Sequence, residues 1–282
     1  MVRLRRVAVR VGLWAGMIYV AWCVAACAMV DTAIFPGAKF RPPAPGPPTV
    51  PGAVLTTHWL EPEPGVRVEA WLYLPAGATA ASPMTTVVFA HGNGETIDLH
   101  GELVRGYVSR GVGVFMPEWR GYGRSTGEPS QAGIASDMRA LRAWLIAQPG
   151  VDARRLVYHG RSLGGGVACE LARTDPPAAM VLESTFTSVT ALTGRMLVPP
   201  VLVRHPFRNR EVLAEATWPL LLMHGTRDQA IPVTHARANR AAAVRSPKVL
   251  YQEFDSNHND LPPPSERARY WALIDELIAT VR

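Results

Sequence analysis

Two segments of this chain carry the pattern Gly-x-Ser-x-Gly, which surrounds the nucleophile of many serine hydrolases. They are GYGRSTGEP at 121–129, which contains Ser125, and YHGRSLGGG at 158–166, which contains Ser162. A serine hydroxyl becomes an effective nucleophile when a histidine takes its proton and a carboxylate orients that histidine. The pattern therefore indicates acyl-transfer chemistry, and only one of the two serines can be its nucleophile.

The two serines differ in the elements predicted around them. A nucleophile elbow needs a strand, a sharp turn with the serine at its apex and then a helix, with small residues on both sides. Ser162 follows the strand-like RLVYH, lies between Gly160 and Gly164, and precedes the helical GGGVACELAR. Ser125 lies well past the end of its strand, and Pro129 keeps the following residues in a loop. We therefore predict that Ser162 is the nucleophile.

Four histidines follow Ser162, and one of them lies where the catalytic base is expected. His258 is in the polar loop DSNHND, directly after the last predicted strand. The others lie in an irregular stretch (His205), at a strand end (His224) and in a helical pattern (His235). We therefore predict His258 as the base.

The acid is expected in the loop after a preceding strand. Asp228, in HGTRDQAIP, is in such a loop, and Glu183 after the strand AMVL is its rival. Asp255 and Asp260 are so close to His258 in sequence that we expect them to shape the loop instead. Asp228 is the predicted acid.

An acyl-transfer transition state also needs backbone N–H donors for its oxyanion. One donor is expected to be the amide of Leu163, the residue after the nucleophile. The second is expected from the loop HGNGE, through the amide of Asn93, with Gly94 as the alternative.

These residues must be positioned by a framework in which strand-like and helix-like segments alternate, the pattern of a mostly parallel α/β sheet wrapped by helices. The predicted strands cover 54–60, 66–74, 86–90, 112–116, 156–159, 179–182, 220–223 and 249–254; the predicted helices cover 99–109, 131–147, 164–173, 234–244 and 266–281. Three strands end in His-Gly, at 91–92, 159–160 and 224–225. Ligands bind at the carboxyl ends of strands in such sheets, so the chemistry is expected along this rim.

Five motifs together resemble a known family: HGNGE, EWRGYGRSTGEPS, HGRSLGGG, HGTRDQAIP and NHND. Their order and spacing are similar to those of α/β-hydrolase-fold serine hydrolases, in particular the subgroup of eukaryotic α/β-hydrolase-domain depalmitoylases and their bacterial membrane-tethered relatives. The resemblance implies an α/β-hydrolase fold with about eight strands, helices on both faces and a small lid. It implies a triad of Ser162, Asp228 and His258, with Asn93 and Leu163 as oxyanion donors.

The resemblance also assigns two further segments. It makes Arg120 to Gly127, with Ser125, a structural loop beside the site. It places the variable lid at about 185–218, where the apolar centre MLVPPVLV could line an acyl pocket or pack on the core. The depalmitoylases attach through an N-terminal cysteine cluster that this chain lacks, so their activity does not carry over.

The N-terminus predicts membrane attachment. Residues 11–30 contain no charged side chain, follow four arginines, and could cross a bilayer as a helix. The stretch Val24 to Cys27 resembles a lipobox, with Cys27 as the lipidation candidate; the alternative is an uncleaved signal-anchor helix. We expect this leader in 1–30, a proline-rich linker in 31–53 that holds the domain away from the membrane, and the hydrolase domain in 54–282. Positive-inside bias favours the exported, periplasmic or extracellular, side for the domain.

Composition excludes one class of partner. The chain has 282 residues, 48% of them hydrophobic, and a formal net charge of +6. Removing the four N-terminal arginines from the 29 basic residues leaves 25 against 23 acidic ones, so the domain lacks the basic excess of a nucleic-acid-binding protein. The three cysteines leave only Cys169 outside the leader, which excludes an internal disulfide in the mature domain.

The sequence therefore predicts a membrane-attached serine hydrolase of the carboxylesterase or thioesterase type, which needs no metal or cofactor. Ser162 would attack an acyl carbonyl, and the substrate would be an acyl ester or thioester. One alternative is a serine peptidase of the prolyl-oligopeptidase-like type. The other is a tethered binding protein without turnover.

Overall fold

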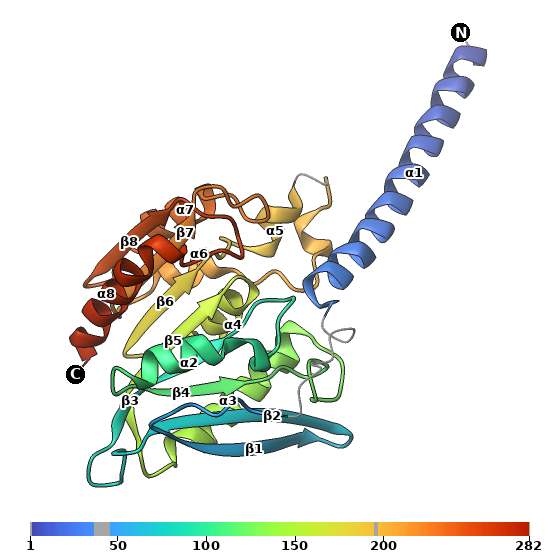
Figure 1. Cartoon of the computed structure of the whole chain (residues 1–282). Coiled ribbons are helices and arrows are strands. Elements are labelled where there is room, and N and C mark those ends of the chain that lie inside the picture. Colours follow the sequence, from blue (N-terminus) through green and yellow to red (C-terminus); the bar gives the residue numbers. More distant parts are fainter. Residues whose placement is uncertain (1, 37–45, 195–196, 282) are drawn as a thin grey trace.

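The computed structural model describes residues 2–36, 46–194 and 197–281. It contains one α/β domain from which a long helix, α1 (Val2–Ile34), projects (Figure 1). Residues 37–45 of the predicted linker lie outside the described part.

The domain is built on one eight-stranded sheet with the strand order β1-β2-β4-β3-β5-β6-β7-β8. β2 pairs antiparallel with β1 and β4, and the other neighbours pair in parallel. The predicted mostly parallel sheet is therefore confirmed. The strands are β1 (Ala53–Glu63), β2 (Val66–Pro75), β3 (Met84–Ala90), β4 (Gly113–Pro117), β5 (Val151–Arg161), β6 (Ala179–Glu183), β7 (Leu220–Gly225) and β8 (Val249–Phe254).

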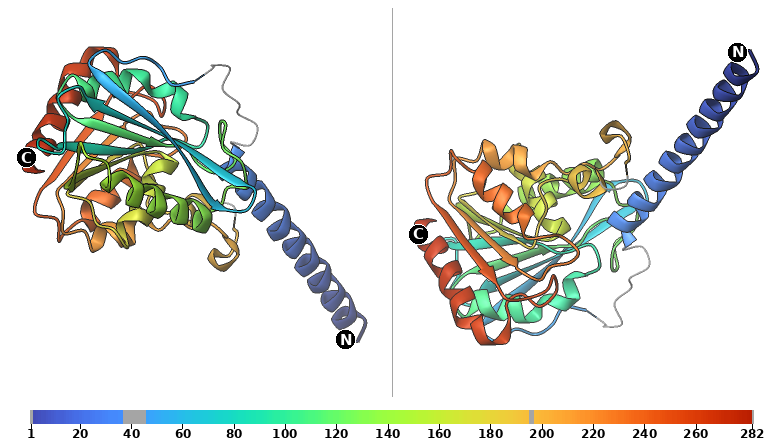
Figure 2. Two further views of the ribbon diagram at one scale, coloured as in Figure 1. Left: turned by 90° about the horizontal axis from the view of Figure 1, so that it is seen from below. Right: turned by 90° about the horizontal axis from the view of Figure 1, so that it is seen from above.

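Helices cover both faces of the sheet (Figures 1 and 2). Successive side chains of a strand point to opposite faces, so Val87 and Phe89 of β3 enter one core and Val88 and Ala90 enter the other. The first core is closed by α2 (Gly101–Val108) and α8 (Arg267–Ile278), and the second by α3 (Gln131–Ile146), α4 (Leu163–Ala172) and α6 (Asn209–Ala214). The remaining helices are α5 (Val189–Thr193), α7 (Thr234–Ala242) and the short 3-10 turns η2 (Ile97–His100), η4 (Pro200–Leu202), η5 (Pro264–Glu266) and η6 (Ala279–Val281).

The segment predicted as a lid, 185–218, holds α5, η4 and α6, and its residues 195–196 lie outside the described part. The stretch after α5 lies beside the C-terminal half of α1 in both figures. Val198 and Val203 enter the core, whereas Leu197 and Val201 are exposed. The apolar centre of this segment is therefore divided between the core and the surface.

Helix α1 extends four residues beyond the predicted leader because its last turns pack on the domain. Ala26, Val30 and Ile34 recur every four residues along one helix face, and all three are buried in the core that α3 and α4 close. Further toward the N-terminus, Trp14 and Ile18 are exposed. The stretch from Val9 to Ile34 has the length and apolar composition of a membrane span.

The described residues on both sides of residues 37–45 contact the domain. The last turns of α1 contact the domain directly. On the far side of the gap, Val50 is buried, and the Pro48 carbonyl accepts a hydrogen bond from the Tyr73 hydroxyl at 3.1 Å. The chain on both sides of the gap is therefore fastened to the domain.

Candidate active site

Ser162 occupies a tight turn between β5 and α4. Its backbone has φ 52° and ψ −118°, in a region that is costly for a residue with a side chain. Three hydrogen bonds hold this conformation: the Ser162 amide donates to the Glu183 carbonyl at 2.8 Å, and the Ser162 carbonyl accepts from the Gly165 amide at 3.0 Å and from the Thr185 hydroxyl at 2.7 Å. The serine is thereby held at the carboxyl edge of the sheet.

The glycines around Ser162 are required by close backbone contacts. A Cβ atom at Gly164 would lie 1.9 Å from the Ala90 carbonyl oxygen, and one at Gly160 would lie 2.4 Å from the Gly164 carbonyl oxygen. Helix α4 therefore begins in contact with the end of β3. This contact brings the first amide of α4 close to the loop that follows β3.

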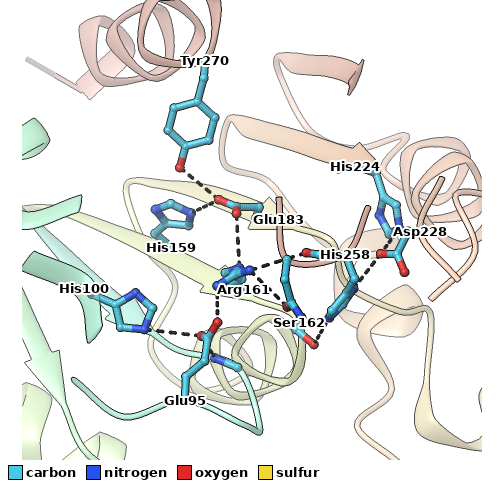
Figure 3. Close-up of polar contacts among 12 residues, drawn as sticks. Glu95, His100, His159, Arg161, Ser162, Glu183, His224, Asp228, His258 and Tyr270 are labelled. Atoms are coloured by element: carbon cyan, nitrogen blue, oxygen red, sulfur yellow. Dashed lines mark hydrogen bonds and ion pairs between the residues drawn. The ribbon is translucent and has the colours of Figure 1, made fainter. Parts of the chain in front are cut away.

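Ser162, His258 and Asp228 lie in hydrogen-bond contact (Figure 3). The distance from His258 Nε2 to Ser162 Oγ is 3.0 Å, and that from His258 Nδ1 to Asp228 Oδ2 is 2.6 Å. The ionised Asp228 carboxylate can only accept, so His258 donates through Nδ1 and its Nε2 is free to accept the serine proton. The loops after β7 and β8, which are adjacent parallel strands, bring these two residues together.

Asp228 is held ionised by its partners. Its side chain is buried, which raises the pKa of the carboxyl, but hydrogen bonds from His224, His258 and the Ile231 amide outweigh burial and bring the pKa below its ordinary value. The Ile231 amide donates to Oδ1 at 2.7 Å, so both oxygens are engaged. A charged, immobile carboxylate of this kind fixes the tautomer of His258.

The two residues predicted as oxyanion donors lie on the same cavity as Ser162 and His258. Asn93 comes from the loop after β3, and Leu163 is the first residue of α4. The Asn93 side-chain amide donates to the Ala33 carbonyl at 2.8 Å, so that side chain is engaged with the last turn of α1. The predicted donor is the backbone amide of Asn93, which this side-chain hydrogen bond does not involve.

Arg161, directly before the serine, joins three loops of the site (Figure 3). Its guanidinium forms ion pairs with Glu95 and with Glu183, the latter at 3.4 Å. It also donates to the His258 carbonyl at 3.5 Å and to the Asn259 side chain at 3.4 Å. Arg161 was not predicted as a site residue, because in the sequence it fills a variable position of the Gly-x-Ser-x-Gly pattern.

Glu95 holds the loop that carries Asn93. Its carboxylate accepts from the Gly92 amide at 2.7 Å and faces His100 at 3.4 Å, as well as Arg161. Burial raises the pKa of Glu95, but His100, Arg161 and the Gly92 amide outweigh it and lower the pKa to about 2. The glutamate of HGNGE is therefore an anionic brace for the turn.

Each histidine of the three His-Gly dipeptides faces a buried carboxylate. His91 Nε2 lies 2.7 Å from Glu118, His159 Nε2 lies 3.3 Å from Glu183, and His224 Nε2 lies 3.2 Å from Asp228. All three imidazoles are essentially inaccessible to solvent. The glycines were expected to mark the rim, and the structure adds that the histidines anchor acids beneath it.

The rival candidates have other partners. Glu183 is buried between Arg161, His159 and the Tyr270 hydroxyl, so it supports the turn at Ser162.

Ser125, the rival nucleophile, has a partner away from His258. Its Oγ accepts from the Glu69 amide at 3.0 Å, which makes it part of the loop after β4. His205 accepts from the Gln131 amide and His235 from the Thr187 amide, so neither base candidate contacts Ser162. Around His258, Asn257 donates to Asp260, and Arg227 pairs with Asp255.

Two cavities are lined in part by Ser162. An apolar one of about 370 Å³ is lined mainly by α1, α5 and Ile231, and a polar one of about 310 Å³ is lined by the loop 92–95, Arg161 and Asn259. Ser162, Asn93 and His258 border both. In the described part of the chain, the His, Cys, Asp and Glu side chains form no group of three that could hold a metal ion.

Cys27 lies within the continuous helix α1. It is half-buried, and its thiol donates to the Leu202 carbonyl at 3.4 Å. The preceding residue, Ala26, is fully buried against the domain.

The sequence of this chain is similar to a family model described as serine aminopeptidase, S33, over residues 81–205. It is 33% identical over 218 residues to the α/β-hydrolase domain-containing protein WAV2 of Arabidopsis thaliana, and the match covers 70% of each chain. It is also 35% identical over 205 residues, or 71% of each chain, to an uncharacterized protein of Mycobacterium tuberculosis.

Solved structures share the fold at lower identity. An esterase of Pyrococcus furiosus superposes with a TM-score of 0.65 at 18% identity, over 86% of this chain and 98% of that one. A putative dipeptidyl aminopeptidase IV of Bacteroides ovatus superposes with a TM-score of 0.63 at 16% identity, over 82% of this chain and 36% of that one.

Proposed function

Because the chain belongs to the α/β-hydrolase family, we propose that it is a serine hydrolase that cleaves carboxylic ester or thioester bonds through an acyl-enzyme on Ser162. The observation that carries the proposal is the chain of contacts from Asp228 through His258 to Ser162, at 2.6 and 3.0 Å. Nucleophile, base and orienting acid need this geometry to act together.

In the proposed mechanism, Ser162 Oγ attacks the acyl carbonyl while His258 Nε2 takes its proton. The negative charge that develops on the carbonyl oxygen is met by the amides of Leu163 and Asn93. The N-terminal end of α4 adds its favourable dipole. His258 then gives the proton to the leaving oxygen or sulfur. Water, activated by the same imidazole, releases the acid and restores Ser162.

The polar cavity favours an ester over a peptide with a free N-terminus. An aminopeptidase needs an anionic group for the substrate ammonium. Among the described residues that line this cavity, the carboxylate is that of Glu95, and it is already paired with Arg161. The aminopeptidase description of the family model is therefore not carried over to the substrate of this chain.

The same proposal has α1 as an intact membrane anchor with the domain on the exported side. Support comes from the uncharged residues 11–30, the arginines before them, and the burial of Ala26. Cleavage before Cys27 for lipidation would remove Ala26 from the core. The structure therefore favours the signal-anchor alternative over the lipobox one.

One experiment tests both the proposed hydrolase activity and the proposed membrane anchor. Membranes washed with carbonate are labelled with a fluorophosphonate probe, and p-nitrophenyl ester hydrolysis is measured beside hydrolysis of aminoacyl anilides. We expect a labelled membrane band at 30.7 kDa and ester hydrolysis, both lost in Ser162→Ala and largely kept in Ser125→Ala. Labelling that survives Ser162→Ala would contradict the hydrolase proposal. A smaller or soluble labelled band would contradict the anchor.

A further inference from the structure

The apolar cavity beside Ser162 is built partly by the helix that projects from the domain. Val30, Ala33 and Ile34 of α1 line it, together with Leu192 and Thr193 of α5. The Asn93–Ala33 hydrogen bond ties the last turn of α1 to the loop with the proposed oxyanion donor. The space of about 370 Å³ is within the range of ligand pockets.

The membrane span and this cavity meet at the same residue. The uncharged stretch of α1 runs from residue 11 to Val30, which at about 1.5 Å per residue is about 30 Å, the thickness of the hydrocarbon core of a bilayer. Val30 is also the first residue of α1 that lines the cavity. If α1 spans the membrane, the cavity therefore begins where the hydrocarbon ends.

A loop of the domain reaches still deeper along α1. The Tyr19 hydroxyl donates to the Leu197 carbonyl at 3.1 Å, and the Cys27 thiol donates to the Leu202 carbonyl. Residues 197–202, which we term the apolar loop, thus run beside the part of α1 that precedes Val30 (Figure 1). Their depth along the helix places them within the hydrocarbon region.

The apolar loop is suited to that environment. Leu197 is 74% exposed and Val201 is 88% exposed, which is unfavourable in water and favourable among lipid chains. Backbone groups in lipid must be satisfied internally. The Leu197 amide donates to the Gly194 carbonyl, just before the loop, and the Leu202 amide donates to the Pro199 carbonyl. Pro199 and Pro200 have no amide hydrogen to satisfy.

We propose that α1 and the apolar loop form an entrance that opens into the leaflet and leads the acyl chain of a bilayer lipid ester to Ser162. The chain would lie in the apolar cavity against Val30 and Leu192, with its carbonyl carbon at Ser162 Oγ. The leaving alcohol would occupy the polar cavity, which Ser162 also lines. This inference rests on the proposed hydrolase function and assigns its substrate to the membrane.

The first test separates leaflet substrates from soluble ones. Full-length protein in phosphatidylcholine vesicles is assayed with 4-methylumbelliferyl oleate, which partitions into the leaflet, and with the water-soluble 4-methylumbelliferyl acetate. Val201→Glu adds a charge that is costly within the hydrocarbon, so we expect oleate hydrolysis to fall about tenfold and acetate hydrolysis to stay within about twofold. Val54→Glu, on the exposed edge strand β1, is the matched control and should change neither rate.

Equal rates of oleate hydrolysis in wild type and Val201→Glu would overturn the entrance. An equal loss of both activities would also overturn it, since the entrance predicts a loss confined to the substrate that partitions into the leaflet. Failure of the proposed function looks different, because wild-type protein would then hydrolyse neither ester, or Ser162→Ala would still hydrolyse acetate.

The second test addresses the α1 wall of the cavity. In detergent micelles, Val30→Trp should reduce hydrolysis of p-nitrophenyl palmitate relative to acetate by about tenfold, because the indole fills the space for the chain. Met29→Trp, one residue away on the exposed side of α1, should keep the wild-type ratio. Leu192→Trp fills the same cavity from α5 and guards against a local distortion of α1. An unchanged palmitate-to-acetate ratio in both cavity variants would refute the proposal.

Discussion

The carboxylate of Glu95 braces the loop that carries Asn93, the proposed oxyanion donor, and its contribution to the free energy of unfolding should depend on pH in a calculable way. The pKa of Glu95 falls from 4.5 to about 2 in the folded protein, and the side chain is 17% exposed. A difference of about 2.5 units corresponds to about 3 kcal/mol in favour of the folded state when the group is ionised. Glu95→Gln removes this charge and should lower the free energy of unfolding by about that amount at pH 7.

The sign follows from the lowered pKa. Glu95 contributes fully above the unfolded-state value of 4.5, and the contribution disappears as the pH falls toward about 2, where the folded carboxyl is protonated. From the two pKa values, about 2 kcal/mol should remain at pH 3.5. The difference in the free energy of unfolding between wild type and Glu95→Gln should therefore be about 1 kcal/mol smaller at pH 3.5 than at pH 7.

Urea unfolding followed by tryptophan fluorescence in detergent micelles measures this gap, and urea leaves the ionic strength unchanged. Glu102→Gln is the matched control, because Glu102 is an exposed residue paired with Arg105 three positions later. It should change stability little at any pH. A gap that is the same at pH 7 and pH 3.5, or an equal loss in the control, would refute the electrostatic role of Glu95.

Two further substitutions test the triad and the elbow. Asp228→Asn keeps the size of the side chain but no longer fixes the His258 tautomer, so kcat for ester hydrolysis should fall by about three to four orders of magnitude. The unfolding curve should stay cooperative. A loss in kcat below tenfold would contradict the assignment of Asp228 as the acid. Gly164→Ala places a Cβ 1.9 Å from the Ala90 carbonyl oxygen and should lower the free energy of unfolding by about 3 kcal/mol or more. Gly194→Ala, where a Cβ meets no atom within 4 Å, is the control and should not lower it. Equal urea midpoints for the two variants would contradict a rigid contact between α4 and the end of β3.

The sequence predicts the sheet and the neighbourhood of Ser162 because their signals are local. Apolar runs mark the buried strands, and the order of strand, glycine-flanked serine and helix distinguishes Ser162 from Ser125. The side chains predicted as base and acid, His258 and Asp228, lie in contact in the structure because each follows one of two adjacent parallel strands. Their catalytic roles remain predictions.

Features that depend on long-range packing were not predicted. The end of α1 at Ile34 accompanies the packing of its last turns on the domain, which the apolar leader does not reveal. Three partners of Arg161, namely Glu95, His258 and Asn259, come from segments 66 to 98 residues away along the chain. The sequence weakly indicated that His224 belongs to the site, since three histidines precede glycine at strand ends. Its contact with Asp228, however, depends on the conformation of the loop that follows β7.

Arg161 has a consequence for how the site comes apart. Its single guanidinium touches the turn after β3, the end of β6 and the loop after β8. If one of these three segments opens, Arg161 loses one of its partners while it still binds the other two, so opening a single segment costs free energy. The three segments should therefore open to solvent as one cooperative unit. A molecule with a disordered His258 loop should also have lost the turn after β3.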